Sequence, residues 1–425
     1  MEYRLFMSIK QLVNTKEILG GLLLRRKIYQ FIDEWVTGEN ISAVLLFIIL
    51  VICVNLKRNI DKLKPTDIVD FSLIISFIIL FLSKLVSNLL LKPIRRACED
   101  ATKLSNNYEE LAKKYKLSNL ITKSNYSDKK ECKYLPVELI YARKKSEEAY
   151  DIKFTDSLKQ YELPDQIASI SEHLFKAHRE SNTYNSRCFR LDKITKIDNE
   201  INMHISRTSY YDTLLTNRAM DFIWPDGRSN RDVYEPGPYI SSLEDSKMSN
   251  HIGINGIIET KDEKFIFVKQ YGNNSIGKNT IGTSIGTVLK AEYILKRDGS
   301  LVEDAVVKAI QREIIEALEV KDLEVKDIEI KKENIVAIYR DLVEGGKPQI
   351  LFYKKINIEQ KKVCWKKREK IIFIKKNVVM NGEVKKNGIS TNEGDYSMMP
   401  SVVASSILIK YYLEKIDLPT EEPNM

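Results

Sequence analysis

The stretch DGSLVEDAVVKAIQREIIEALEV (298–320) decides the fold of the C-terminal half of this chain. Apolar residues return along it at helical spacing and predict an amphipathic helix whose core face carries Ala305, Ala309, Ile310 and Ile314. The helix is also markedly acidic, with carboxylates at Glu303, Asp304, Glu313, Glu316 and Glu319. Glu313 and Glu316 are three residues apart and therefore project on neighbouring faces. We expect a helix with one buried face and several exposed charges.

Strand patterns lie on both sides of this helix. Before it, residues 254–258 and 265–268 are apolar runs, and residues 260–264 form a polar turn between them. The segment IGTSIGTVLK (281–290) then supplies small residues where a backbone can approach a ligand closely. Two more strands and a closing helix are expected at 333–339, 349–358 and 398–415. This order indicates an α/β domain.

The acidic helix and its surroundings resemble the Nudix family. The family box reads Gly, five residues, Glu, seven residues, Arg-Glu, an apolar residue, any residue, Glu-Glu, any residue, Gly and an apolar residue. Arg312 and Glu313 match the central pair, Ile314 and Val320 match the apolar positions, and Glu316 matches the first Glu of the later pair. The resemblance implies a Nudix-like α/β/α sandwich with a mixed sheet.

The box departs from the family pattern at several positions. The leading Gly falls on Asp298, with Gly299 one place late, the isolated Glu on Asp304, the second Glu of the pair on Ala317, and the closing Gly on Glu319. In the family the acidic cluster holds Mg²⁺ or Mn²⁺, and such hard cations need several converging carboxylate oxygens. Because Ala317 removes one of them, the resemblance implies a domain that binds a nucleotide without cleaving it, and no cofactor is expected.

Two alternatives stay open for this helix. If the box is active, Arg312, Glu313 and Glu316 are the catalytic candidates, and Glu313 and Glu316 would hold Mg²⁺. The protein would then be a membrane-anchored pyrophosphohydrolase acting on a nucleoside diphosphate derivative. In the other alternative, the stretch is an acidic surface helix of an unrelated α/β domain.

The composition excludes several classes of protein. Of the 425 residues, 43% are hydrophobic and 30% charged, which excludes a mostly disordered chain. The net charge of +8 permits contact with phosphate-rich partners or an anionic membrane but requires neither. Five cysteines without a C-x-x-C pair do not indicate a disulfide framework or a zinc site.

Two apolar runs near the N-terminus predict a transmembrane hairpin. They are ISAVLLFIILVICVNL (41–56) and FSLIISFIILFLSKLVSNLLL (71–91), each close to the ~20 residues that span a bilayer core. A signal peptide followed by a buried helix fits less well, because the first run lies far from the start and no small-residue cleavage site follows it. Lys and Arg flank the hairpin ends and crowd its linker, which modestly favours both termini in the cytoplasm.

Lys84 is the ionisable residue deep within the second run. It is expected either to extend toward the membrane interface or to face a bundle interior or a pore. Two spans cannot form a channel alone, so a pore would need self-association into a homo-oligomer.

The expected domain boundaries follow these patterns. Residues 1–40 form an N-terminal cytoplasmic segment, 41–92 the hairpin, 93–200 a helical connector, and 201–425 the Nudix-like domain. The connector carries Leu104, Tyr108, Leu111 and Tyr115 at steps of four, three and four, a seam suited to a coiled coil or a docking helix. The fold class is therefore a membrane protein of α+β type.

Taken together, a membrane hairpin, a connector and a degenerate Nudix domain resemble the transmembrane–Nudix effectors of bacterial CBASS antiphage systems. The resemblance implies a multi-pass protein of the inner membrane whose Nudix-like domain lies in the cytoplasm. A partner CD-NTase would act functionally, without stable contact, by making a cyclic di- or oligonucleotide on infection. Binding of that nucleotide would rearrange the hairpins, disrupt the bilayer and kill the infected cell.

A cyclic nucleotide requires cations near its phosphates, amide donors, and flat side chains for its bases. By residue type and position, the candidates are Tyr210, Tyr211, Asn217, Arg218, His251 and Ser284. A third reading is a membrane scaffold whose cytosolic domain binds protein and no nucleotide.

Overall fold

The computed structural model describes residues 104–105, 108–115, 120–122, 134–176, 178, 185–270, 277, 280–319, 328–365, 370–385 and 388–414. The chain divides into two compact units, and nearly all of these residues belong to the unit made of 103–224 and 228–425. The predicted hairpin (41–92) and Lys84 lie outside the described residues. Among the described residues, no helix is long and apolar enough to cross a membrane.

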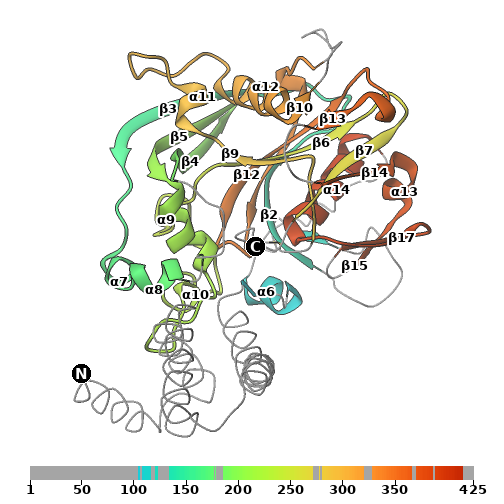
Figure 1. The fold of residues 1–425 in the computed structure, drawn as a ribbon. Helices are drawn as coiled ribbons and strands as arrows, with labels where there is room; N and C mark the ends of the chain where they lie inside the picture. The colour runs from blue at the N-terminus through green and yellow to red at the C-terminus, as the bar shows by residue number, and fades with distance from the viewer. Residues whose placement is uncertain are drawn as a thin grey trace, which may run out of the picture. The chain divides into compact units, whose positions relative to one another are not determined.

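A mixed sheet forms the centre of the larger unit (Figure 1). Its strand order is β1-β2-β11-β12-β6-β7-β14, with β8 paired to β7 and β9 to β6. The β12–β6 pair is parallel, with Gln349 opposite Gly253 and Lys355 opposite Glu259, and its other pairs are antiparallel. The strands are β1 (Leu120–Thr122), β2 (Tyr134–Ala142), β6 (Gly253–Glu259), β7 (Lys264–Lys269), β8 (Ile281–Gly282), β9 (Ile285–Val288), β11 (Ile335–Asp341), β12 (Lys347–Lys355) and β14 (Lys370–Lys375).

The central strands are buried on both faces, because their apolar side chains alternate between two cores. In β12, Ile350 and Phe352 enter a first core, while Leu351 and Tyr353 enter a second. In β6, the bare backbone of Gly256 lies against Phe352, whose ring atoms would come within 2.0 Å of an added Cβ. A glycine at this position therefore lets the Phe352 ring fill the first core.

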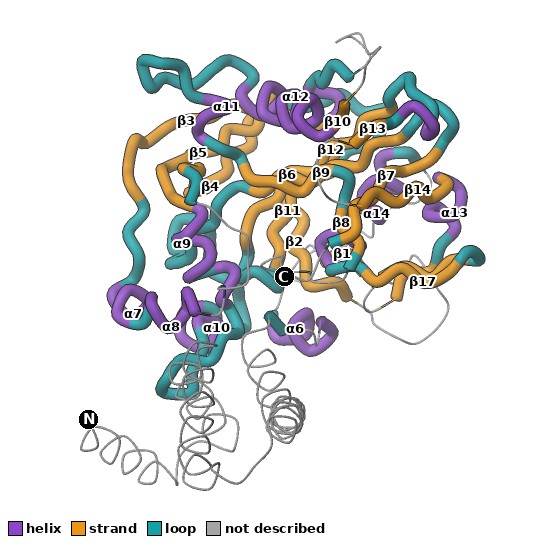
Figure 2. Tube along the Cα trace, in the orientation of Figure 1, coloured by secondary structure: helices purple, strands orange, loops and turns teal. Residues whose placement is uncertain are grey.

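Helices cover both faces of the sheet (Figure 2). Helices α11 (Ala291–Ile294) and α12 (Ala305–Ala317) pack on the first core. Helices α14 (Pro400–Tyr412), α6 (Tyr108–Lys114) and α13 (Lys376–Asn381) pack on the second. Leu111 and Tyr115 from the seam predicted around α6 are buried in the second core, so this segment docks on the domain. The expected α/β/α layering is therefore present.

A second sheet of three strands, in the order β3-β5-β4, packs against the first core. It is joined to the central region by backbone bridges between Cys188 and Lys290 and between Arg190 and His251. Its strands are β3 (Asp151–Gln160), β4 (Arg187–Ile197) and β5 (Glu200–Ser209). Short helices beside it build a third apolar cluster around Met220 and Trp224. They are α7 (Asp165–Ser169), α8 (Ser171–Lys176), α9 (Tyr210–Leu215), η4 (Asn217–Ala219) and α10 (Asn230–Tyr234).

The remaining elements are short. Strands β10 (Leu318–Glu319) and β13 (Cys364–Trp365) pair with each other, and β15 (Glu383–Lys385), β16 (Gly388–Thr391) and β17 (Gly394–Ser397) form a small meander. Two single turns of 3₁₀-helix are η6 (Lys332–Asn334) and η7 (Gln360–Lys362).

The structure confirms most of the expected elements and corrects one range. The strands expected at 254–258, 265–268, 333–339 and 349–358 correspond to β6, β7, β11 and β12, and the closing helix to α14. The expectation of a helical connector at 93–200 does not hold for its described residues, because β2, β3 and β4 lie there. Strand β2 pairs with β11 inside the central sheet, since its apolar residues are needed to cover the second core.

Candidate functional site

The acidic helix α12 holds its principal carboxylate in an internal ion pair. Glu313 is 1% exposed and accepts a hydrogen bond from Thr287 Oγ1 on β9 at 2.9 Å. The ammonium of Lys290, two residues after the end of β9, lies 3.1 Å from the same oxygen, Oε1. Burial opposes the charge on Lys290, but its hydrogen bond to Tyr293 and the nearby Glu313 carboxylate prevail and raise its pKa. Glu313 is thus neutralised from within the domain.

The second box carboxylate, Glu316, is occupied as well. Its Oε2 accepts a hydrogen bond from the Tyr293 hydroxyl at 2.8 Å, and its Oε1 lies 3.3 Å from Arg312 Nε. Lys290 and Arg312 each lie 4.7 Å from the centre of the Tyr293 ring, within cation–π range. Lys290 thus links Glu313 to Tyr293, and Tyr293 in turn contacts Glu316 and Arg312.

A divalent cation does not fit this arrangement. A metal would have to displace Lys290 from Glu313 and both partners from Glu316, and Ala317, fully buried, offers no ligand. Within the residues that the structure describes, no three His, Cys, Asp or Glu side chains gather as a metal site. Among these described residues, no cluster of carboxylates therefore compensates for the one that Ala317 lacks.

The ligand candidates around residues 210–218 are positioned by a capped helix. At the start of α9, Ser209 and Asp212 form a capping box in which each side chain accepts from the other's backbone N–H. The helix ends at Leu215, Thr216 caps it, and η4 then carries Asn217 and Arg218. This local sequence places a buried amide next to a partly exposed guanidinium.

Asn217 ties three segments together. Its Nδ2 donates to Asn250 Oδ1 at 3.0 Å and to the Glu344 carbonyl at 2.8 Å, and its Oδ1 accepts from the Asn250 backbone N–H at 2.8 Å. The side chain is fully buried, so these bonds are needed to satisfy its amide. Helix η4, the segment before β6, and the turn between β11 and β12 therefore meet at this residue.

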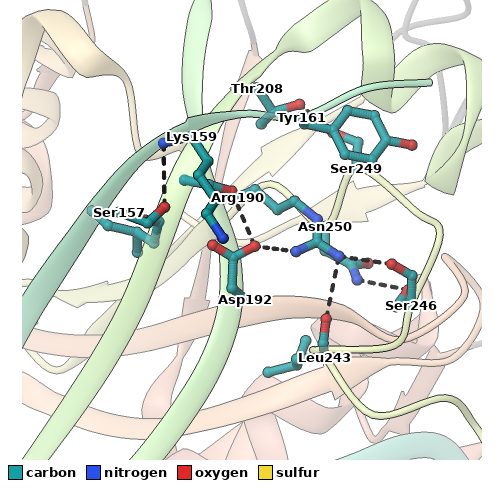
Figure 3. A network of polar contacts seen from close by, with 12 residues as sticks. Ser157, Lys159, Tyr161, Arg190, Asp192, Thr208, Leu243, Ser246, Ser249 and Asn250 are labelled. Atoms are coloured by element: carbon teal, nitrogen blue, oxygen red, sulfur yellow. Dashed lines mark hydrogen bonds and ion pairs between the residues drawn. The ribbon is translucent and has the colours of Figure 1, made fainter.

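The segment that leads to His251 is held by Arg190 of β4 (Figure 3). The Arg190 guanidinium donates to the carbonyls of Ser246 at 2.7 Å, of Leu243 at 3.2 Å and of Met248 at 3.2 Å, and forms an ion pair with Asp192. Asn250 adds a hydrogen bond to Ser246 at 2.9 Å. A buried guanidinium that binds three carbonyls fixes the path of residues 243–250.

His251 lies at the end of this path, fully buried. Its Nδ1 and Thr213 Oγ1 are 2.6 Å apart, and Tyr210 stacks on its ring at 5.9 Å with an 18° tilt. Its Nε2 is buried and has no hydrogen-bond partner among the described residues. Burial, together with the charges of Lys347 and Arg218, lowers the pKa of His251 well below its usual range. The ring is therefore neutral at pH 7.

Charged side chains from the β11–β12 turn complete the group. Glu344 Oε2 lies 3.0 Å from Arg218 Nε and 3.7 Å from Lys347 Nζ, contacts that are ion pairs and not aligned hydrogen bonds. Asp341 is fully buried, and burial, together with Glu344, raises its pKa to about 7. Burial, reinforced by Arg218 and opposed by Glu344, lowers the pKa of Lys347. We call these residues the buried polar cluster: Thr213, Asn217, Arg218, Ser249, Asn250, His251, Asp341, Glu344 and Lys347.

Of the predicted ligand residues, Tyr210, Asn217, Arg218 and His251 are brought together at this cluster. Tyr211 packs instead edge-on against Phe175, 5.1 Å away. Ser284 takes part in the central sheet, where its hydroxyl accepts from the Ile258 N–H at 2.8 Å. Sequence reasoning missed Asp341, Glu344, Lys347 and Lys290, since charges beside a Gly-Gly turn or after a short strand ordinarily face solvent.

Comparisons with known proteins add little to this geometry. No family model matches the chain, and no curated protein matches it. Among solved structures, one described as "Crystal structure of Tm1382, a putative Nudix hydrolase" shares 15% identity over 38% of this chain and 70% of that one, with a TM-score of 0.24. A likeness of this size identifies neither the family nor the activity.

Proposed function

We propose that the protein is a membrane effector whose Nudix-like domain binds a cyclic di- or oligonucleotide and does not hydrolyse it. The observation that carries this proposal is the internal neutralisation of α12. The Lys290 ammonium lies 3.1 Å from Glu313, the carboxylate that a Nudix hydrolase would offer to a metal. A fixed ammonium supplies positive charge without the open coordination positions that metal catalysis needs.

The proposal also draws on the buried polar cluster. Neutral side chains could fill this part of the core equally well. Instead, Arg218 and Lys347 lie near His251, and the Tyr210 ring stacks on the His251 ring. Cations, an imidazole and a flat ring are the groups that bind phosphates and bases. The apolar runs at 41–56 and 71–91 would anchor the protein in the inner membrane as a homo-oligomer. Nucleotide binding would then rearrange the hairpins and disrupt the bilayer.

Co-expression with a cyclic-nucleotide synthase tests this function. We expect a loss of membrane potential, followed by arrested growth, when synthase and effector are expressed together. A chain lacking residues 41–92 is the matched control and should leave the potential intact. An unchanged potential, in cells where binding of the nucleotide to the effector is demonstrated, contradicts the proposal.

The hydrolase alternative is tested with the purified full-length protein. It requires Mg²⁺-dependent release of phosphate or nucleoside monophosphate from nucleoside diphosphate derivatives, lost in Glu313→Gln. We expect no turnover in either the wild type or this variant. Turnover that disappears with Glu313 would replace the effector proposal by an anchored pyrophosphohydrolase.

A further inference from the structure

The buried polar cluster contains an internal anion at the point where its cations meet. Glu344 is 2% exposed, and its Oε2 lies 3.0 Å from Arg218 Nε and 3.7 Å from Lys347 Nζ. Neither contact is an aligned hydrogen bond at Oε2, so charge attraction is what holds this oxygen beside the two cations. A ligand anion whose two free oxygens align with these donors would be a better partner for both, because charge-assisted bonds gain strength from alignment.

An unused polar atom belongs to the same cluster. His251 Nε2 is buried without a hydrogen-bond partner among the described residues, and the charges of Lys347 and Arg218 act on its ring. A buried nitrogen left without a partner is unfavourable, so this one beside buried cations indicates a site that its ligand completes. In the tautomer in which Thr213 donates to Nδ1, the ring proton of His251 sits on Nε2, where it can be donated to an anion.

We propose that Arg218, Lys347 and His251 form the phosphate subsite for the cyclic nucleotide, and that Glu344 occupies this subsite in the ligand-free protein. This inference rests on the proposed function and locates the part of the nucleotide site that binds phosphate. One phosphodiester carries one negative charge and two free oxygens. It can therefore replace the single charge of Glu344 without changing the net charge of the cluster.

The location of Glu344 permits such an exchange. It belongs to the turn between β11 and β12, where Gly345 and Gly346 adopt positive φ values of 64° and 81°. Arg218 is 14% exposed at the side chain, and Tyr210 is half-buried, so one side of the cluster reaches the surface. Release of Glu344 would also disturb the hydrogen bond from Asn217 to its carbonyl, so that ligand entry would move the turn relative to η4. A ligand drives such a change only through its higher affinity for one of the two states.

The test uses the full chain in detergent and measures the Kd for 3′,3′-cyclic di-AMP, cyclic di-GMP, cyclic GMP–AMP and cyclic tri-AMP by calorimetry. For whichever nucleotide binds the wild type, Glu344→Gln should bind about tenfold more tightly, because it removes the competing charge. Lys347→Met should bind about tenfold more weakly or not at all. Arg218→Lys keeps the charge but loses the planar fork, and should also weaken binding. It probes the subsite independently if Lys347→Met does not fold.

Glu259→Gln is the matched control. Glu259 is a fully buried glutamate held by Lys376 at 2.8 Å and Lys355 at 3.0 Å, and it lies at the far end of β6 from His251. The Kd of the Glu259→Gln variant for the nucleotide should stay within about twofold of the wild-type value, since distant sites act independently. If the wild type binds a nucleotide but Glu344→Gln gains no affinity, the subsite is overturned while the proposed function stands. If neither the wild type nor Glu344→Gln binds any of the four, the proposed function falls with it.

Discussion

Helix α12 and the buried polar cluster each bury a glutamate beside a lysine, but the two glutamates differ in their hydrogen bonds. At α12, Glu313 receives an aligned hydrogen bond from Thr287 in addition to the Lys290 ammonium. In the cluster, Glu344 Oε2 has ion pairs without aligned hydrogen bonds, and Asp341 Oδ2 has no partner among the described residues. The first arrangement is complete as it stands, whereas the second leaves capacity for another group. Mutations that remove single charges or hydrogen-bonding groups from each region test this difference.

The largest effect on stability is expected at the complete pair. Glu313→Ala leaves the Lys290 ammonium and the Thr287 hydroxyl without their buried acceptor, which should destabilise the domain by about 3–5 kcal/mol. The measurement is urea unfolding followed by tryptophan fluorescence. The double variant Lys290→Met/Glu313→Leu replaces the pair by apolar groups and should recover most of this loss. A double variant as unstable as Glu313→Ala would show that the pair acts through packing and not through charge.

Asn217→Ala should rank second. It leaves the Asn250 N–H and the Glu344 carbonyl unpaired in a buried region, at about 2–3 kcal/mol. Asn202→Ala is the control, because Asn202 makes an exposed hydrogen bond to Thr155 and should lose less than about 1 kcal/mol. Equal losses in the two variants would mean that Asn217 does not join the three segments. Chemical denaturation of both variants in parallel decides this.

The sequence predicted the frame of the molecule better than the cluster. Apolar runs identified β6, β7, β11, β12 and α14, because strands buried on both faces must be apolar over their whole length. It did not predict that β2 belongs to the sheet, since YLPVELIYA carries Glu138 and Pro136 and lies two hundred residues from its partner β11. Long-range pairing of this kind leaves no local pattern.

The candidate site was predicted in part, and for a definite reason. Asn217, Arg218 and His251 were chosen by chemical type, and they meet because η4 and the segment before β6 are adjacent in the fold. Lys290 and Lys347 were missed because a lysine is ordinarily solvated. Only the folded sheet shows that Lys290, just beyond β9, and Lys347, at the start of β12, turn inward.

The pH dependence of folding stability also distinguishes the two regions, with an effect of intermediate size. The pKa of Asp341 is raised from about 4 in the unfolded chain to about 7 in the fold, facing Glu344, Lys347 and Arg218. Because the folded pKa is the higher one, this carboxyl favours folding fully below pH 4, and that contribution is lost as the pH rises through 7. Asp341→Asn removes the charge and keeps the acceptor for the Val343 N–H.

We therefore expect Asp341→Asn to match the wild type near pH 4 and to become more stable than it as the pH rises to 8, by roughly 2–4 kcal/mol. Thermal midpoints at pH 4, 5, 6, 7 and 8 measure the difference. Parallel curves for the two proteins would place the Asp341 titration outside this range. Glu313→Gln is the control: it keeps Asp341, so its stability should follow the same pH dependence as that of the wild type over this range.

The smallest effect is expected at the exposed end of α12. Arg312 and Glu316 are 57% and 43% exposed, so water and salt screen their ion pair. Arg312→Ala should cost about 0.3–0.5 kcal/mol, and raising the salt concentration to 1 M should shrink this further. Arg312→Lys keeps the charge but loses the planar stack on Tyr293, so it separates the two contributions. A loss near that of Glu313→Ala would mean that Arg312 and Tyr293, and not Lys290 alone, hold the acidic helix in its neutralised state.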